Sequence, residues 1–200
     1  TLTLADGRKI NLDMATDGKL AEESGIKITK TADGQIIYQL VPTPKTVNIE
    51  ASYNTIETPK GGQYKIVLPD SSRVWLNAAS SLKYPTNFSA ENRTVELKGE
   101  AYFEVSPDKQ RPFLVKSDRQ LTRVLGTQFN ISAYEEEETV KTTLVEGAVS
   151  VVPSSISSSG ASHLSTVLKP GEQSTMLNGK TSVAKVDLAP YISWKKGVFY

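Results

Sequence analysis

Two glutamates in the middle of the chain, Glu100 and Glu104, are the side chains that a glycoside hydrolase could use as its catalytic pair. In an extended strand the two carboxylates would share one face, with Tyr102 between them. Four residues of strand rise would separate them by about 13 Å, which is more than either known arrangement of catalytic carboxylates requires. A β-sandwich hydrolase is therefore the least favoured of three hypotheses, and we predict that the chain is not an enzyme.

The only histidine, His163, lies in a serine- and glycine-rich stretch, residues 153–165. A serine nucleophile would also need an orienting acid and a strained turn, and the sequence has no Gly-x-Ser-x-Gly motif. One histidine, with no cysteine in the chain, is too few ligands for a metal site. We therefore predict no catalytic residue, cofactor or metal, and we interpret residues 153–165 as a polar loop that cannot bury enough apolar area to become ordered.

Two charged stretches resemble ligand-binding loops only superficially. Glu135–Glu138 is a run of four carboxylates that suits calcium or a basic partner. Calcium loops alternate their ligands around a glycine bend, and this run has no glycine, so a solvated hairpin tip is the better interpretation. In Thr58–Gly62 the lysine precedes the glycines and a strand follows, whereas a phosphate loop ends in Gly-Lys and opens a helix. We expect a simple turn there.

The aromatic residues support a second hypothesis, a carbohydrate-binding β-module in which Trp75, Trp194 and several tyrosines stack on sugar rings. It requires two or more coplanar rings that face the solvent. Val74 and Leu76 share one strand face, so Trp75 lies on the other face, where it is either exposed or covered by a second layer. Tyr191 and Trp194 lie three residues apart, and we expect them to dock a short helical turn on the domain.

Short strands separated by turn signals must position these side chains. Tyr64–Leu68 and Arg73–Leu76 alternate apolar and polar residues, and Pro69-Asp70-Ser71-Ser72 has the composition of a tight hairpin turn. The same alternation predicts further strands on either side of glycine-containing turns: Thr94–Lys98 and Ala101–Val105 flank Gly99-Glu100, and Thr139–Val145 and Ala148–Val152 form a hairpin around Glu146-Gly147.

The N-terminal region repeats a strand–turn–strand unit around Asp6-Gly7 and Asp33-Gly34, a dipeptide that suits type I′ turns. Leu4–Leu12 is similar to Leu68–Leu76, which indicates one hairpin type used repeatedly. We predict an all-β fold of about fifteen or more short, mainly antiparallel strands. A twisted sandwich and a β-helix-like stack of hairpins fit equally well, and one short helical turn is expected after Asp187.

Composition limits the classes of partner. The 200 residues suffice for one large all-β domain or two small ones. The formal net charge of +1 provides no field of one sign to attract nucleic acid or a membrane surface. The absence of cysteine excludes disulfides and is compatible with an oxidising compartment. The sequence contains neither a signal peptide nor an apolar run of membrane length, so we predict no direct membrane insertion by these residues.

Several blocks of this sequence resemble the FecR family, which comprises membrane-anchored sigma-factor regulators of Gram-negative bacteria. A single block would be a weak signal, but several blocks in the family's order are specific, and together they cover about residues 55–175. The blocks are Val67–Ala78, Gly99–Val105, Pro112–Val115, Leu125–Ile131, Leu144–Val149 and Leu168–Gln173.

This resemblance implies a non-enzymatic periplasmic signalling domain of a FecR-like anti-sigma factor of the Bacteroidetes type. In that family a TonB-dependent outer-membrane receptor contacts the periplasmic part of the regulator, and the signal frees an extracytoplasmic-function sigma factor. The resemblance also implies an inner-membrane anchor and a cytoplasmic sigma-binding segment outside these residues. We accordingly expect residues 1–186 to form the periplasmic domain, and residues 187–200 to form a linker and the start of a further small domain.

The resemblance leaves several properties of the molecule open. No short motif marks the partner-binding residues in this part of the family. The inducing nutrient, an iron-siderophore or a glycan, is not encoded in any residue pattern, and neither is the oligomeric state. The loop at 153–165 is a conceivable site of proteolysis during signalling, although it is far in sequence from the membrane side, which argues against cleavage there.

Overall fold

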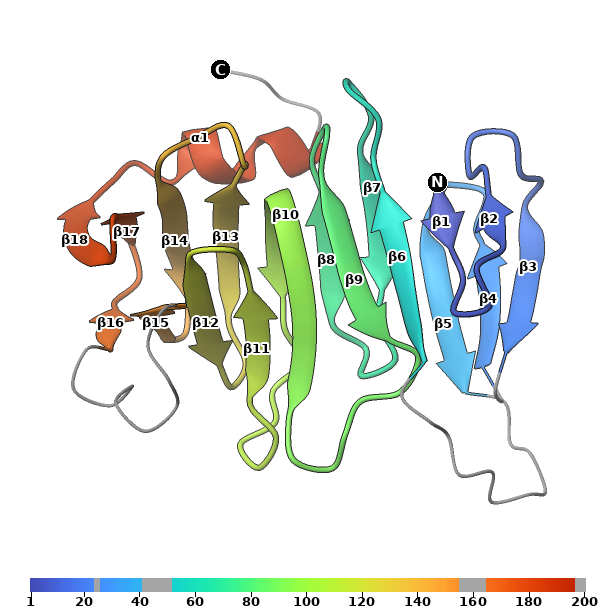
Figure 1. Ribbon diagram of the computed structural model, residues 1–200, viewed down its shortest axis with the longest axis horizontal. Coiled ribbons are helices and arrows are strands. Elements are labelled where there is room, and N and C mark those ends of the chain that lie inside the picture. Colours follow the sequence, from blue (N-terminus) through green and yellow to red (C-terminus); the bar gives the residue numbers. More distant parts are fainter. Residues whose placement is uncertain (24–25, 41–51, 155–164, 197–200) are drawn as a thin grey trace.

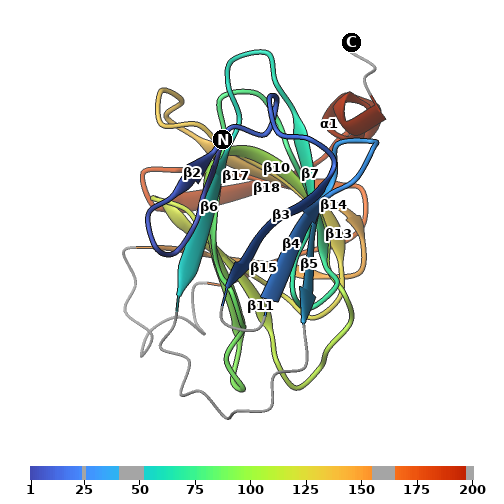
Figure 2. The ribbon, with the colours of Figure 1, turned by 90° about the vertical axis from the view of Figure 1, so that its right-hand side faces the viewer.

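The structure, a computed structural model, describes residues 1–23, 26–40, 52–154 and 165–196. These residues form eighteen β-strands and, at their C-terminal end, one helical turn followed by a 3-10 turn (Figure 1). The strands are arranged in two layers that face each other, as the end-on view in Figure 2 shows. The all-β prediction is confirmed. No helix among the described residues is long and apolar enough to cross a bilayer.

The first layer, sheet A, consists of nine strands. Its neighbours are antiparallel except β10 and β11, which are parallel. In spatial order the strands are β2 (Lys9–Ile10), β1 (Leu2–Thr3), β6 (Tyr53–Glu57), β9 (Ser81–Pro85), β10 (Arg93–Glu104), β11 (Phe113–Lys116), β12 (Gln120–Val124), β15 (Val149–Pro153) and β16 (Thr166–Leu168).

The second layer, sheet B, consists of ten strands and shares β10 with sheet A. Its only parallel pair among the described residues is β5 with β7. In spatial order the strands are β3 (Gly18–Glu23), β4 (Ile26–Lys30), β5 (Ile36–Leu40), β7 (Tyr64–Val67), β8 (Arg73–Leu76), β10, β13 (Gln128–Ala133), β14 (Val140–Glu146), β17 (Glu172–Leu177) and β18 (Lys180–Lys185).

The shared strand β10 corrects one expectation. Thr94–Lys98 and Ala101–Val105 are not two strands, because twelve residues run continuously from Arg93 to Glu104. The first half of β10 pairs with β9 and β11 in sheet A, and the second half pairs with β8 and β13 in sheet B. Gly99 stands at the change of sheet with φ +82°, a conformation that only glycine adopts readily. The glycine bends a strand here instead of closing a hairpin.

The predicted hairpin around Glu146-Gly147 is also wrong. β14 pairs with β13 and β17 in sheet B, whereas β15 pairs with β12 and β16 in sheet A. Gly147 has φ +93°, and a Cβ placed on it would lie 2.9 Å from the carbonyl oxygen of Gly126. The chain therefore crosses from sheet B to sheet A at Gly147. The Glu146-Gly147 pair, which suggested a hairpin turn, belongs to this closely packed crossing.

The turns that contain Asp6-Gly7 and Asp33-Gly34 differ in type from the prediction. Gly7 and Gly34 have positive φ, but Asp6 and Asp33 do not, so these are not type I′ turns. Each turn has one left-handed residue, and the amide of that residue donates to a carbonyl three residues earlier. The turn in Leu68–Ser72 has the same bonds, with Ser71 at the left-handed position. The repeated hairpin type is thus confirmed, while its turn class is corrected.

Ser71 provides a test of this turn geometry. Its φ is +67°, and its side chain is exposed, so a β-carbon costs energy here without a packing contact in return. Replacing Ser71 with glycine should raise the free energy of unfolding by about 0.5–1 kcal/mol, measured by urea denaturation. The reciprocal control is Gly34→Ser at the equivalent position, which should lower stability by a similar amount. Equal stability of Ser71→Gly and the wild type would contradict the assigned turn.

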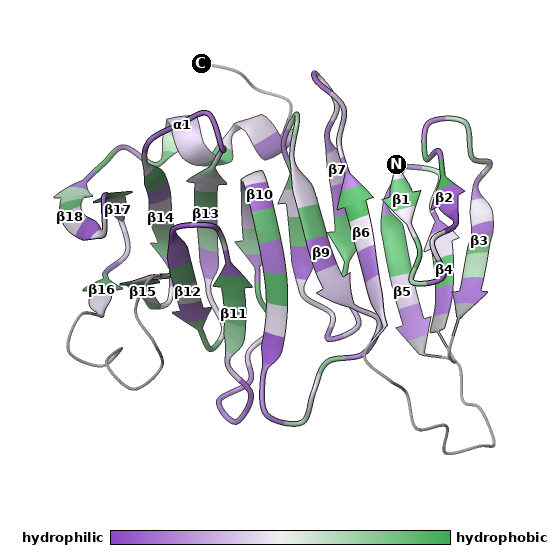
Figure 3. Ribbon diagram, in the orientation of Figure 1, coloured by the Kyte–Doolittle hydropathy of each residue, from purple (hydrophilic) through white to green (hydrophobic). Residues whose placement is uncertain are grey.

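The hydrophobic core lies between the two sheets. Figure 3 shows hydrophobic and hydrophilic residues alternating along the central strands, as expected for strands with one face inward. Val74 and Leu76 of β8 are completely buried, and Phe103 of β10 stacks on Phe129 of β13 with ring centroids 5.0 Å apart. Phe113 of β11 meets Phe103 edge-on from sheet A, with centroids 6.2 Å apart. The contacts among these three buried rings connect the two layers at β10, the strand that they share.

Candidate functional site

The outer face of sheet B, directed away from the core, carries a connected group of aromatic and charged side chains. Because Val74 and Leu76 point inward, Arg73 and Trp75 of β8 point outward. On the neighbouring β10, Tyr102 pairs in register with Trp75, and Glu104 pairs with Arg73. We name Arg73, Trp75, Tyr102 and Glu104 the outer-face cluster.

Lys195 from the C-terminal turn inserts its ammonium into this cluster. Its Nζ lies 3.7 Å from the centroid of the Tyr102 ring and 5.1 Å from that of Trp75. The same Nζ is 3.2 Å from Oε1 of Glu104, whose other oxygen is 2.8 Å from Nη2 of Arg73. Two aromatic faces and one carboxylate thus surround a lysine side chain that is only 14% exposed.

The C-terminal segment brings Lys195 to this position by lying outside sheet B. Helix α1 (Ala189–Ile192) and the 3-10 turn η2 (Trp194–Lys196) follow β18 and lie on the outer side of that layer (Figure 2). The helical turn follows Asp187, as the sequence predicted; the carboxylate of Asp187 accepts the amide of Ala189, and Pro190 fits the first turn. Trp194 is only 5% exposed, which confirms that this residue docks the turn.

Tyr102 is held in its neutral form. Burial raises the pKa of Tyr102 to about 12, and the charges of Glu104 and Glu146 add to the effect. Its hydroxyl donates to Oε1 of Gln128 at 3.1 Å. A neutral phenol near physiological pH keeps its ring available as a cation-binding face beside Glu104.

The glutamates that suggested a hydrolase each have other partners. Glu100 accepts hydrogen bonds from the side-chain amides of Asn77 and Asn130, at 2.7 and 2.8 Å. Glu104 forms its two ion pairs within the outer-face cluster. Both oxygens of each carboxylate are therefore engaged in binding protein groups, which gives the hydrolase hypothesis no support.

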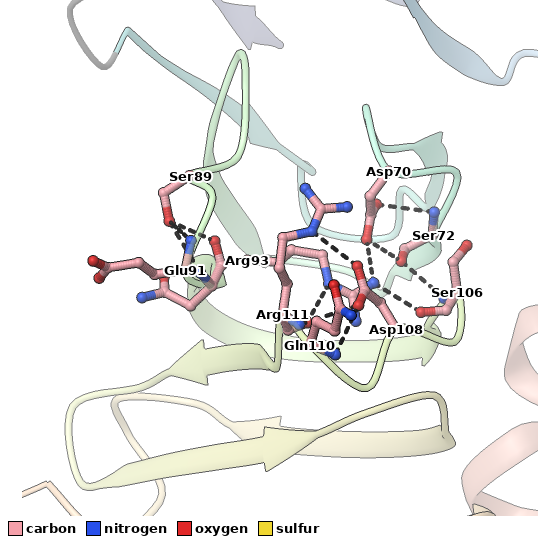
Figure 4. Close-up of polar contacts among 10 residues, drawn as sticks. Asp70, Ser72, Ser89, Glu91, Arg93, Ser106, Asp108, Gln110 and Arg111 are labelled. Atoms are coloured by element: carbon pink, nitrogen blue, oxygen red, sulfur yellow. Dashed lines mark hydrogen bonds and ion pairs between the residues drawn. The ribbon is translucent and has the colours of Figure 1, made fainter.

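A second polar group is buried beneath the loops at one end of β10. Arg93 is 1% exposed and pairs with Asp70, whose side chain is 5% exposed, at 2.8 Å (Figure 4). The same guanidinium donates to the backbone oxygens of Ser106 and Arg111, and Asp70 accepts from the amide and hydroxyl of Ser72. This network joins the β7–β8 turn and the β10–β11 connection to the first residue of β10, so we interpret it as structural.

The charged stretches behave as the sequence predicted. Glu135–Glu138 forms the tip between β13 and β14, where the hydrogen bond with Lys98 lowers the pKa of Glu135 and raises that of Lys98. Lys60 and Gly61 lie in a turn closed by the amide of Gly62. In the described part of the chain, no three metal-ligating side chains gather. Residues 155–164 of the predicted loop, which include His163, lie outside the described residues.

The tryptophans do not form the predicted sugar-binding platform. Trp194 is buried, and Trp75 is half-buried beneath Lys65 and Lys195, whose ammonium groups lie 4.9 and 5.1 Å from its ring. The rings of Trp75 and Tyr102 are inclined by 74°, so they are not coplanar. The sequence left open whether Trp75 is exposed or covered by a second layer. In the structure the C-terminal segment covers it, through Lys195.

The two-sheet fold and the outer-face cluster define an all-β domain with aromatic and charged side chains gathered on the outer face of one sheet. Residues 54–150, which include the whole outer-face cluster but not Lys195, match the family described as FecR protein. This match confirms the resemblance to the FecR family that is seen in the sequence blocks.

Solved structures extend the similarity beyond that region. Two crystal structures of a candidate anti-sigma factor from Parabacteroides distasonis, at 2.50 and 1.65 Å resolution, are 31% and 32% identical to this chain. Their TM-scores are 0.65 and 0.64, and each match includes 72% of this chain. The chain spans 65% of the length of either structure. No curated protein matches the sequence.

Sequence reasoning missed two of the central residues. Lys195 stands in an unremarkable Trp-Lys-Lys run, and nothing in its surroundings points to Trp75, 120 positions earlier by numbering. Arg93 reads as an ordinary surface arginine between Asn92 and Thr94. Its alternation with Val95 and Leu97 was the available signal, because it places Arg93 on the buried face of the strand.

Proposed function

We propose that this chain is the non-enzymatic signalling domain of a FecR-like anti-sigma regulator. In this proposal the domain lies in the periplasm and relays a signal from a TonB-dependent outer-membrane receptor to an extracytoplasmic-function sigma factor. The observation that carries the proposal is the FecR match at residues 54–150, together with similarity to solved structures described as anti-sigma factors.

The domain arrangement is part of the same proposal. Residues 1–186 serve as the periplasmic domain, and residues 187–200 lead into a further small domain. Sigma-factor binding and the inner-membrane anchor belong to segments outside these 200 residues. The architecture supports a presenting role, because a core shared by two sheets offers rigid surfaces and exposed strand edges for a partner.

A calorimetric titration tests the proposal. The chain is titrated with the N-terminal signalling domain of the outer-membrane receptor encoded beside it, and a form extended past Tyr200 is titrated in parallel. Binding by the extended form alone supports the proposal and places the contact after Tyr200. Binding by both places contacts within it. No binding by either form, with a folded receptor domain, overturns the proposed relay and leads to a glycan array.

If both forms bind, a charge reversal at the acidic tip locates the contact. Glu136 is exposed at the tip of the β13–β14 hairpin, and Glu91 is exposed in the loop before β10. A loss of affinity for Glu136→Lys with no change for Glu91→Lys would assign the tip to the receptor. Equal affinities would direct the search to the sheet edges.

A further inference from the structure

The outer-face cluster has the construction of a binding site for an alkylammonium ion. Tyr102 and Trp75 present two inclined ring faces, and Glu104 supplies a carboxylate on a third side. The attraction between a cation and an aromatic face is stronger when the cation is desolvated than when the cation is exposed to water. The Lys195 side chain is largely removed from solvent. The ion pair between Arg73 and Glu104 fixes the carboxylate beside the rings.

The segment that supplies the ammonium has few other attachments. Helix α1 is four residues long, none of those four is buried, and its N-cap residue, Leu188, makes no side-chain capping hydrogen bond. A helix this short is unstable by itself, so its position depends on tertiary anchors. Within residues 187–196, as far as the structure describes their side chains, Trp194 is the buried anchor, and Lys195, 14% exposed, is the second contact.

The site and its occupant also belong to different parts of the chain. Arg73, Trp75, Tyr102 and Glu104 all lie within the FecR match at residues 54–150, and Lys195 lies 45 positions beyond it by numbering. The contact therefore connects the FecR region to the segment that leaves it.

We propose that the outer-face cluster is a lysine-recognition site, and that Lys195 is its ligand in cis, so that residues 187–196 form a releasable strap. The chemical class of the ligand is a polypeptide lysine that follows an aromatic residue, as Lys195 follows Trp194. Displacement of this lysine frees the strap and uncovers Trp75 and Tyr102, while the two sheets and their core remain intact.

The first test measures release in the full chain. Lys195→Met keeps an unbranched side chain, one heavy atom shorter, and removes its charge. We expect amide hydrogen exchange at residues 189–196 to accelerate about tenfold or more, and acrylamide quenching of tryptophan fluorescence to increase. The urea midpoint of global unfolding should not change. The matched control is Lys185→Met, an exposed lysine of β18, which should alter none of these readouts.

The second test measures recognition in trans. A synthetic peptide with the sequence of residues 187–196 is titrated into the Lys195→Met chain, and the same peptide with norleucine at its Lys195 position is the control. Binding by the lysine peptide alone, abolished by Tyr102→Leu in the same chain, supports the proposal.

Three results would overturn it. Unchanged exchange at residues 189–196 in Lys195→Met would make the contact incidental. Loss of cooperative unfolding in that variant would make Lys195 part of the structural core instead of a releasable anchor. Equal binding of both peptides, or binding of neither, would show that the cluster does not recognise the ammonium. None of these results depends on the outer-membrane receptor, so failure here and failure of the proposed relay are distinguishable.

Discussion

Replacing Arg93 with methionine should destabilise the domain by about 3–5 kcal/mol, the usual cost of removing one partner from a buried ion pair. The Arg93 side chain is 1% exposed and that of Asp70 is 5% exposed, so water cannot compensate the carboxylate that remains. Two backbone oxygens, those of Ser106 and Arg111, also lose their guanidinium donor. The measurement is the free energy of unfolding in urea, with circular dichroism as the readout.

Two further variants separate the charge effect from lost packing. In Asp70→Asn with Arg93→Met the uncompensated charge is absent, so the double variant should recover part of the lost stability. Arg111→Met removes the more exposed ion pair between Arg111 and Asp108, in which the side chains are 40% and 24% exposed, respectively. This change should lower the free energy of unfolding by less than about 1 kcal/mol. Equal losses for Arg93→Met and Arg111→Met would show that burial of the Arg93 pair has no energetic consequence.

Replacing Gly99 with alanine should be the most damaging single methyl addition in the shared strand. A Cβ at Gly99 would lie 2.4 Å from Oγ and 2.8 Å from Cα of Ser80, and φ is +82°. Oγ of Ser80 accepts the amide of Glu100 and donates to the oxygen of Ala78, so it cannot move freely. Strain and overpacking together predict a loss of about 3–4 kcal/mol in the free energy of unfolding.

Gly7 is the matched control for that prediction. Its φ of +86° is nearly the same, but no atom lies within 4 Å of a Cβ placed on it. Gly7→Ala should therefore cost only the backbone term, about 1–2 kcal/mol, and the difference between the two variants measures the steric conflict with Ser80. Similar losses in Gly7→Ala and Gly99→Ala would contradict the tight crossing at Gly99.

Local patterns predicted the strands better than the connections between them. Alternation of apolar residues correctly located β7 and β8, because the inward face of each strand follows from its own sequence. Gly99 and Gly147 were misinterpreted because a positive φ suits a hairpin turn and a crossing between sheets equally well. Contacts with Ser80 and Thr127, distant in the sequence, distinguish these two outcomes.

The outer-face cluster was less predictable than the fold. The sequence placed Trp75 on the outward face of its strand and expected Trp194 to dock a helical turn, and both predictions are confirmed. It could not join the two, because the approach of Lys195 to Tyr102 depends on how the C-terminal segment crosses sheet B. A cation–aromatic contact between remote residues leaves no spacing or periodicity in the sequence.

The strand common to both sheets has a consequence for the order in which the molecule folds. Its two halves pair with four different strands, β9 and β11 in sheet A and β8 and β13 in sheet B. Neither sheet can complete its ladder before β10 is in place, so the two layers cannot assemble as independent kinetic units. A nascent chain that has not yet delivered residues 93–133 has only a hairpin-rich fragment with unpaired edges, and commitment to the native topology waits for that region.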